Sequence, residues 1–228
     1  MGSTRQGQTK KYILYACGEI LLVVAGILIA LQVNNQNIRA QAKLVERQFY
    51  QTMQVQLVED KELINDERYG ITDRIDSYVI GMKYIVDNDH EQLEDLAAKV
   101  YLLLEYGDFR RKSSVYQTLI YSGEITYIKN KDILKSLQEL ERTYQFIERI
   151  EATQANFVMS HTAPAINEIL DFESGELVIP NLVFTRSFKN NFFLAIRLAS
   201  EKNQELEYAL SVIDHTLKAI DDELGLTL

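Results

Sequence analysis

The sequence contains few of the residues that crosslink, break or kink a chain. Its 228 residues include one cysteine, two prolines, ten glycines and no tryptophan. A single cysteine cannot pair within the chain, which excludes a disulfide-stapled fold. The low glycine and proline content excludes collagen-like and low-complexity chains. Because 46% of the residues are hydrophobic, the chain is also not disordered as a whole.

Basic residues are the minority among the charges. The chain has 24 Lys+Arg against 33 Asp+Glu, a net charge of −9. The excess lies in residues 41–228, which hold 20 Lys+Arg and 32 Asp+Glu. Nucleic-acid binding needs a basic surface that neutralises phosphates, so we expect no nucleic-acid partner.

One long apolar run stands near the N-terminus, at Tyr12–Val33 (YILYACGEILLVVAGILIALQV). As a helix these 22 residues would span about 33 Å, enough to cross a hydrocarbon core of roughly 30 Å. The best signal-peptidase position, after Ala30, would place the large Leu28 where a small residue is needed. Cys17 precedes most of the apolar run, whereas a lipoprotein cysteine would follow it. We therefore predict an uncleaved transmembrane anchor.

The orientation of this anchor is only weakly encoded. Three Lys/Arg residues stand on each side of the run, so the positive-inside rule barely separates the two orientations. The basic residues before the run and the free amino terminus favour an N-terminus inside the cell. This predicts a cytoplasmic tail at residues 1–11, a transmembrane helix at 12–33 and an extracytoplasmic domain at 34–228.

Glu19 is an ionisable residue inside the predicted span, where a charged carboxylate is costly. Gly26 and Ala30 lie near the same helix face and form a small-xxx-small pair, which lets two helices approach closely. We expect this face to contact another helix. Glu19 is then either a proton, cation or partner-binding site, or a protonated carboxyl that is hydrogen-bonded across a helix pair.

Glycine and proline are absent from residues 34–69, 124–163 and 181–224, which predicts long helices. In the last stretch, ten positions follow heptad spacing and nine of them are apolar. The polar exception, Asn203, can fix the register of packing. The ten positions are Phe192, Ile196, Ala199, Asn203, Leu206, Leu210, Ile213, Leu217, Ile220 and Leu224.

A second apolar stripe runs from Met53 to Ile85 and is interrupted at Asp60 and Glu67. Together these patterns predict an all-α chain, in which the transmembrane helix continues into a long-helix, coiled-coil-like bundle. The apolar stripes can be buried by antiparallel packing of helices within the chain or by pairing between subunits, and the sequence pattern fits both arrangements.

The sequence offers little catalytic chemistry. Cys17 lies in the predicted membrane segment, and the three histidines form no HExxH motif. No glycine-rich phosphate loop is present, so we expect no metal, no cofactor and no enzymatic activity.

One basic cluster, Arg110, Arg111 and Lys112, precedes an apolar helix that should begin near Val115. Cations at a helix start can bind an anion. The alternative is that Ser113 or Ser114 caps the helix and the cations balance an acidic surface.

Residues 18–35 (GEILLVVAGILIALQVNN) resemble the opening of a family of uncharacterised bacterial single-pass membrane proteins. A weaker likeness extends to Ser122-Gly123 and Ile128–Asn130, whereas Gln36 stands where the family often has tryptophan. The resemblance implies an inner-membrane anchor with a periplasmic helical domain, and it carries over no catalytic residues.

These observations favour a membrane-anchored interaction protein, either a scaffold or an accessory subunit of an envelope complex. Its expected partners are the lipid bilayer and, through the transmembrane helix, copies of itself or other membrane proteins. Two alternatives remain. One is a homo-oligomeric channel or proton-linked component that uses Glu19. The other is a ligand-binding sensory module that signals through a partner.

Overall fold

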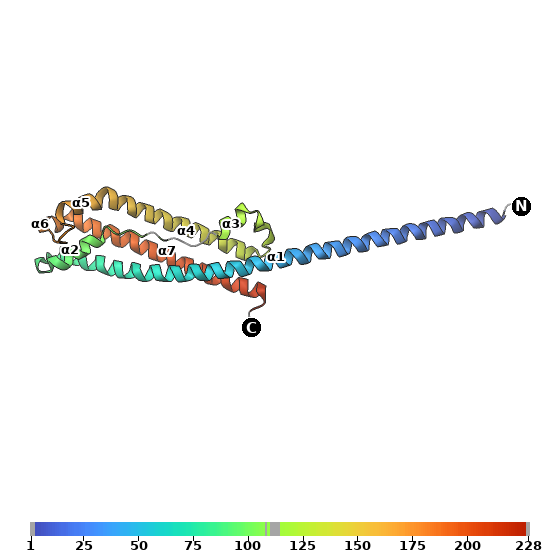
Figure 1. The fold of residues 1–228 in the computed structure, drawn as a ribbon, viewed down its shortest axis with the longest axis horizontal. Coiled ribbons are helices and arrows are strands. Elements are labelled where there is room, and N and C mark those ends of the chain that lie inside the picture. Colours follow the sequence, from blue (N-terminus) through green and yellow to red (C-terminus); the bar gives the residue numbers. More distant parts are fainter. Residues whose placement is uncertain (1–2, 108, 110–114, 227–228) are drawn as a thin grey trace. The chain divides into compact units, whose positions relative to one another are not determined.

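The computed structural model describes residues 3–107, 109 and 115–226. Within these residues the chain is all-α, as predicted, and the only β-type pairing is an isolated bridge between Leu170 and Leu177. The chain divides into two compact units, residues 1–49 and 50–228. The first helix, α1 (Ser3–Asp87), begins in the first unit and ends in the second (Figure 1).

The first unit consists of the N-terminal part of α1. The predicted continuation of the apolar helix through Asn34–Asn37 is confirmed, because α1 runs through these residues without a break. Every side chain from residue 18 to residue 41 is exposed. An 18-residue window here has a mean hydropathy of 1.7 and no buried residue, and α1 is the one described helix that is long and apolar enough to cross a membrane.

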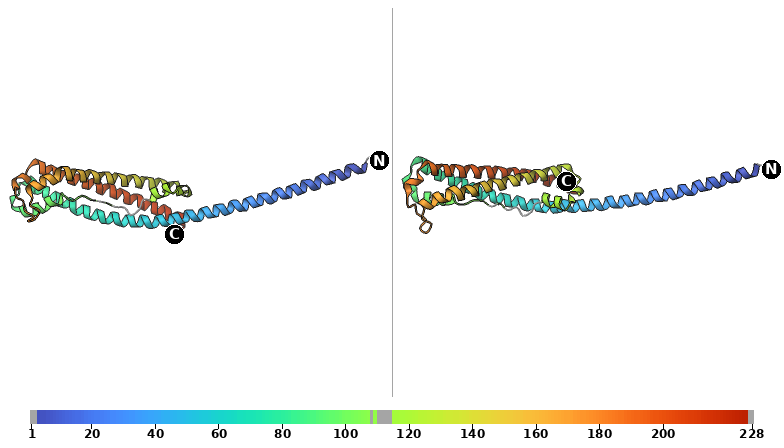
Figure 2. Two further views of the ribbon diagram at one scale, coloured as in Figure 1. Left: turned by 45° about the horizontal axis from the view of Figure 1, so that its top comes forward. Right: turned by 90° about the horizontal axis from the view of Figure 1, so that it is seen from above.

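The second unit is built on three long helices, namely the C-terminal part of α1, α4 (Lys131–Phe157) and α7 (Arg186–Leu224). Figure 2 shows α4 and α7 side by side in both views. Shorter helices connect them: η1 (His90–Gln92), α2 (Leu93–Leu102), α3 (Val115–Tyr121), η2 (Glu124–Tyr127), η3 (Val158–Thr162), α5 (Ala163–Ile169) and α6 (Pro180–Val183).

The turns lie where the local sequence predicts them. After α1 ends at Asp87, Asn88 takes a positive φ of 53°, a conformation that asparagine tolerates. Asp89 then caps η1 by accepting a hydrogen bond from the Glu91 N–H at 3.0 Å. The Asn130 side chain caps α4 by accepting from the N–H groups of Asp132 and Ile133, at 2.9 and 3.2 Å.

Two of the predicted long helices differ from the expectation at one end. In the stretch 124–163 the helix begins at Lys131, directly after the cap that the sequence predicts at Asn130, but it passes into a π-helical turn, η3, at Val158. This turn directly precedes the helix that holds Pro164, which has no N–H and whose ring cannot follow an α-helical turn without strain. The helix predicted across 181–224 begins at Arg186, because the separate short helix α6 starts at Pro180.

Polar side chains join α1 to α7 in a ladder that defines their antiparallel packing. Gln54 donates to Asp221 at 2.6 Å, Lys61 pairs with Asp214 at 2.5 Å, and Arg68 pairs with Glu207 at 3.4 Å. Successive rungs are seven residues apart on both helices, which is the heptad interval. We call these three pairs the α1–α7 ladder.

The core of the second unit has a distinct cluster at the end where α1 stops and α7 starts. Here α2, α5 and α6 cover the long helices, and the aromatic rings of Tyr78 and Phe192 meet edge to face, with centroids 6.5 Å apart. The fully buried members also include Leu96, Val100, Ile166 and Val183.

Gly81 gives the first testable prediction. A β-carbon there would lie 2.6 Å from the Phe192 ring and 2.9 Å from the Lys99 β-carbon. We expect Gly81→Ala to lower the free energy of unfolding by about 1–2 kcal/mol, because overpacking outweighs the better helix propensity of alanine. Thermal unfolding of the full chain in detergent, followed by circular dichroism, measures the change.

Gly70 is the matched control on the same helix. A β-carbon at Gly70 meets nothing closer than the Arg74 guanidinium, at 4.0 Å. Gly70→Ala should therefore raise stability by about 0.5–1 kcal/mol. If both variants were stabilised equally, the close packing of α1 against Phe192 would be refuted.

Candidate functional site

The face of α1 that carries Glu19, Gly26 and Ala30 lies open. All three residues are exposed, and a β-carbon built on Gly26 would find no atom within 4 Å. Glu19 also lines a shallow, mostly apolar groove of about 280 Å³ together with Ile20, Val23 and Val24. Within the described residues nothing covers this face, so a second helix could approach the backbone at Gly26 closely.

The basic cluster Arg110, Arg111 and Lys112 lies outside the described residues, as do Ser113 and Ser114. Both alternatives for this cluster, an anion-binding site and a helix cap at Ser113 or Ser114, therefore stay predictions.

The predicted heptad stripe lies on α7 and is partly buried by the same chain. Phe192, Ala199, Leu206, Ile213, Ile220 and Leu224 are buried, whereas Ile196, Asn203, Leu210 and Leu217 are half-buried. Asn203 accepts a hydrogen bond from Arg68 Nε at 3.0 Å, so it joins α7 to α1 at the edge of the packed face.

A buried charged cluster, which the sequence analysis did not single out, lies next to Asn203. Lys202 extends from α7 with only 2% of its side chain exposed. Its Nζ donates to Glu67 Oε1 of α1 at 2.8 Å and to Glu151 Oε1 of α4 at 2.6 Å. The interruption of the α1 stripe at Glu67 was the one sequence signal for this arrangement. We call Lys202, Glu67, Glu151 and Arg74 the ionic layer.

The ionic layer is balanced in charge and closed by backbone groups. Arg74 of α1 donates to Glu67 Oε1 at 3.2 Å, which gives two cations for two carboxylates. The Phe109 N–H donates to Glu151 Oε1 at 2.7 Å. Gly107 lies so close to Lys202 Nζ that any side chain there would collide with it. Because Lys202 of α7 donates to carboxylates of α1 and α4, the ionic layer joins three helices.

A second polar feature lies on the surface between α4 and α7. It is a shallow groove of about 400 Å³ whose lining includes two arginines, Arg142 and Arg149, and two glutamates, Glu139 and Glu205. Tyr208 donates a hydrogen bond to Glu139, and this bond raises the pKa of the Tyr208 phenol. The opposite charges offset one another, so this groove does not indicate a ligand of either sign.

Metal ligation is not indicated by the part of the chain that the structure describes. No group of three or more His, Cys, Asp or Glu side chains there is placed to hold a metal ion.

The comparisons found no family model, no curated protein and no solved structure that matches the chain.

Proposed function

We propose that the chain is a membrane-anchored helical interaction protein, a scaffold or accessory subunit of an envelope complex in the bacterial inner membrane. One observation carries the proposal. From Gly18 onward the apolar part of α1 is exposed, so it requires a lipid or protein environment that the described chain does not supply. The resemblance of residues 18–35 to bacterial single-pass proteins supports the inner membrane, with residues 34–228 in the periplasm.

The open face at Gly26 and Ala30 supports a helix partner rather than lipid alone. Side chains as small as these allow backbones to approach, and association of membrane helices depends on such packing. Glu19 on the same face would lose its costly exposure to lipid when a second helix covers it. The partner helix belongs to a second copy of this chain or to another membrane protein.

Crosslinking in native membranes separates these two partners. The full chain carries a C-terminal tag, and mass spectrometry identifies what co-purifies with it. Other membrane proteins recovered in a fixed ratio would support an accessory subunit, and a discrete oligomer of this chain alone would support self-assembly. Recovery of the uncrosslinked chain alone would refute the proposal.

A paired substitution tests the helix face itself. We expect Gly26→Leu with Ala30→Leu to reduce the crosslinked product about tenfold, since the added side chains separate the helices by more than their packing tolerates. Val24→Phe with Leu28→Phe adds the same number of side-chain carbons on the side of α1 away from Gly26 and Ala30, and it should leave the product unchanged. Equal yields from both variants would contradict association through Gly26 and Ala30.

A second candidate function follows from the carboxyl group that Glu19 exposes on an otherwise apolar helix. In a homo-oligomer these carboxyls would form a ring that could pass protons or cations. This candidate predicts that Glu19→Gln keeps the crosslinked oligomer but abolishes ion flux into liposomes. Unchanged flux would exclude it.

A further inference from the structure

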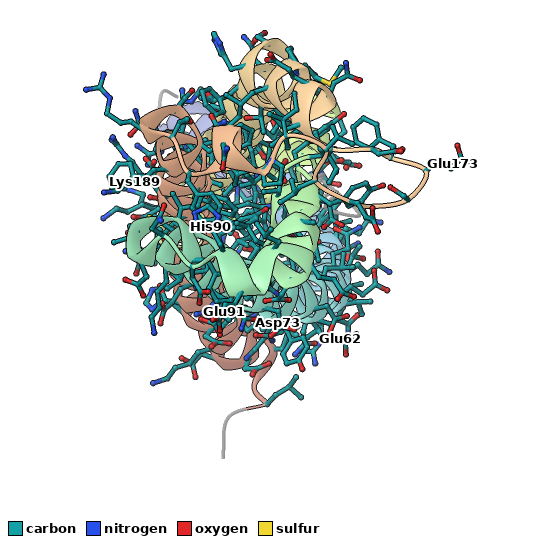
Figure 3. All side chains as sticks on the ribbon, turned by 90° about the vertical axis from the view of Figure 1, so that its left-hand side faces the viewer. Glu62, Asp73, His90, Glu91, Glu173 and Lys189 are labelled. Carbon is teal, nitrogen blue, oxygen red and sulfur yellow. The ribbon has the colours of Figure 1, made fainter. Side chains whose placement is uncertain are left out.

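A cleft of about 370 Å³ lies at the end of the second unit where α1 stops and α2 starts. The first turns of α2 form one wall, and the loop between α5 and α6 forms the other. The lining residues are Leu93, Glu94, Ala97, Ser174, Gly175, Glu176 and Leu177. Figure 3 views the molecule from this end and shows Glu173 on the projecting loop at the right, with Glu91 below the middle of the view.

The loop wall is held in place by its own hydrogen bonds. The Gly175 N–H donates to the Asp171 carbonyl at 2.8 Å, and the Asp171 N–H donates to the Glu176 carbonyl at 2.9 Å. The Glu173 N–H donates to the Asp171 carboxylate at 2.8 Å. Gly175 has a φ of 75°, which favours glycine at this turn. The cleft is therefore formed before anything binds, which lowers the entropic cost of binding.

The charge around the cleft has one sign. Residues 87–95 carry five carboxylates and residues 171–180 carry three, with no lysine or arginine in either segment. Glu94 and Glu176 stand on opposite walls and are exposed. No hydrogen bond or ion pair joins either carboxylate to the described part of the chain, so both can receive a cation.

The loop that carries Glu176 also exposes apolar side chains. Val178 is 60% exposed and Phe172 is 51% exposed. The Phe172 ring meets the Tyr101 ring edge to face, with centroids 6.3 Å apart. Inside the cleft, Ala97 is buried and Leu177 is half-buried. A group that fits this surface must therefore present both positive charge and apolar area.

We infer that this cleft binds a basic amphipathic segment of a partner protein. An arginine or lysine of the segment enters between Glu94 and Glu176, and its apolar side chains pack on Phe172 and Val178. Arginine suits the position best, because its planar guanidinium can bridge two carboxylates. The inference rests on the proposed interaction function, but it uses a surface separate from Gly26 and Ala30.

The test uses the full chain in a non-ionic detergent and a fluorescent peptide that alternates arginine and leucine. Anisotropy measures the Kd. We expect Glu94→Gln with Glu176→Gln to weaken binding about tenfold, since both carboxylates lose their charge without losing their size. Replacing the arginines of the peptide with citrulline should have a similar effect, and Val178→Ser should also weaken binding.

Glu62→Gln with Asp73→Asn is the matched control. Both residues are exposed on α1 (Figure 3), and the pair removes the same total charge. Unchanged binding in this control supports the cleft. Equal weakening in both double variants would mean that the peptide responds only to net charge, and this would overturn the inference. The Gly26→Leu and Ala30→Leu variant should bind the peptide normally, so a failure of the transmembrane contact is distinguishable from a failure of the cleft.

Discussion

Replacing Lys202 with alanine should lower the free energy of unfolding by about 3 kcal/mol, because it leaves two carboxylates buried without their shared cation. The side chains of Glu67 and Glu151 are 24% and 11% exposed, so solvent screens them only in part. Because of this partial exposure, we expect a loss of stability at the lower end of the range of about 3–5 kcal/mol that is typical of broken buried ion pairs. Chemical denaturation of the full chain in detergent, followed by circular dichroism, gives the value.

A second variant tests whether the lost stability of Lys202→Ala comes from unpaired charge or from the lost side-chain volume. Lys202→Met combined with Glu151→Gln removes one cation and one carboxylate, and it leaves Arg74 paired with Glu67. The side-chain volumes stay similar, and the amide oxygen of the new glutamine can still accept from the Phe109 N–H. We expect this double variant to recover most of the stability lost in Lys202→Ala. If the double variant were as unstable as Lys202→Ala, charge balance would not govern this position.

Two aspartates placed in the apolar part of α1 should release the chain from membranes. Each charged residue near the centre of a membrane helix costs about 2.5–3.5 kcal/mol, so Val24→Asp with Leu28→Asp would remove about 5–7 kcal/mol of insertion energy. We expect the variant to leave the membrane fraction after an alkaline wash, as detected by immunoblotting, whereas the parent chain stays in the pellet.

The control for this variant places the same charges on the same helix beyond the apolar run. Gln36→Asp with Gln41→Asp changes two exposed polar positions and should leave the chain in the pellet. Retention of the Val24→Asp and Leu28→Asp variant in the membrane would contradict a transmembrane role for this segment.

The sequence was sufficient to predict the helical architecture. Heptad spacing and the absence of glycine and proline pointed to the long helices, and Asn130 marked the start of α4. The π-helical turn at Val158 was not predicted, because it depends on how the chain approaches Pro164 rather than on composition. The start of α7 was also misjudged, since Pro180 opens a short helix of its own.

The ionic layer could not be predicted because the same residue types are usually solvated. Lysine and glutamate on a long helix normally face water, and only the packing of three helices reveals that Lys202 is buried. Its neighbour Asn203 attracted attention as the polar member of an apolar stripe, yet Asn203 lies at the edge of the packed face. The cleft at the start of α2 likewise joins two segments about 80 residues apart in the chain, which no local pattern connects.

The α1–α7 ladder has a consequence for how the helices find their alignment during folding. Its rungs repeat every seven residues, so a slide of α7 by one heptad would bring Lys61 to Asp221 and Arg68 to Asp214, and two rungs would form again. The same slide would move Lys202 from Glu67 to Arg74, where two cations would meet. The ladder alone therefore gives little preference for the native alignment over the shifted one. Lys202 supplies that preference, because it meets a carboxylate only in the native alignment.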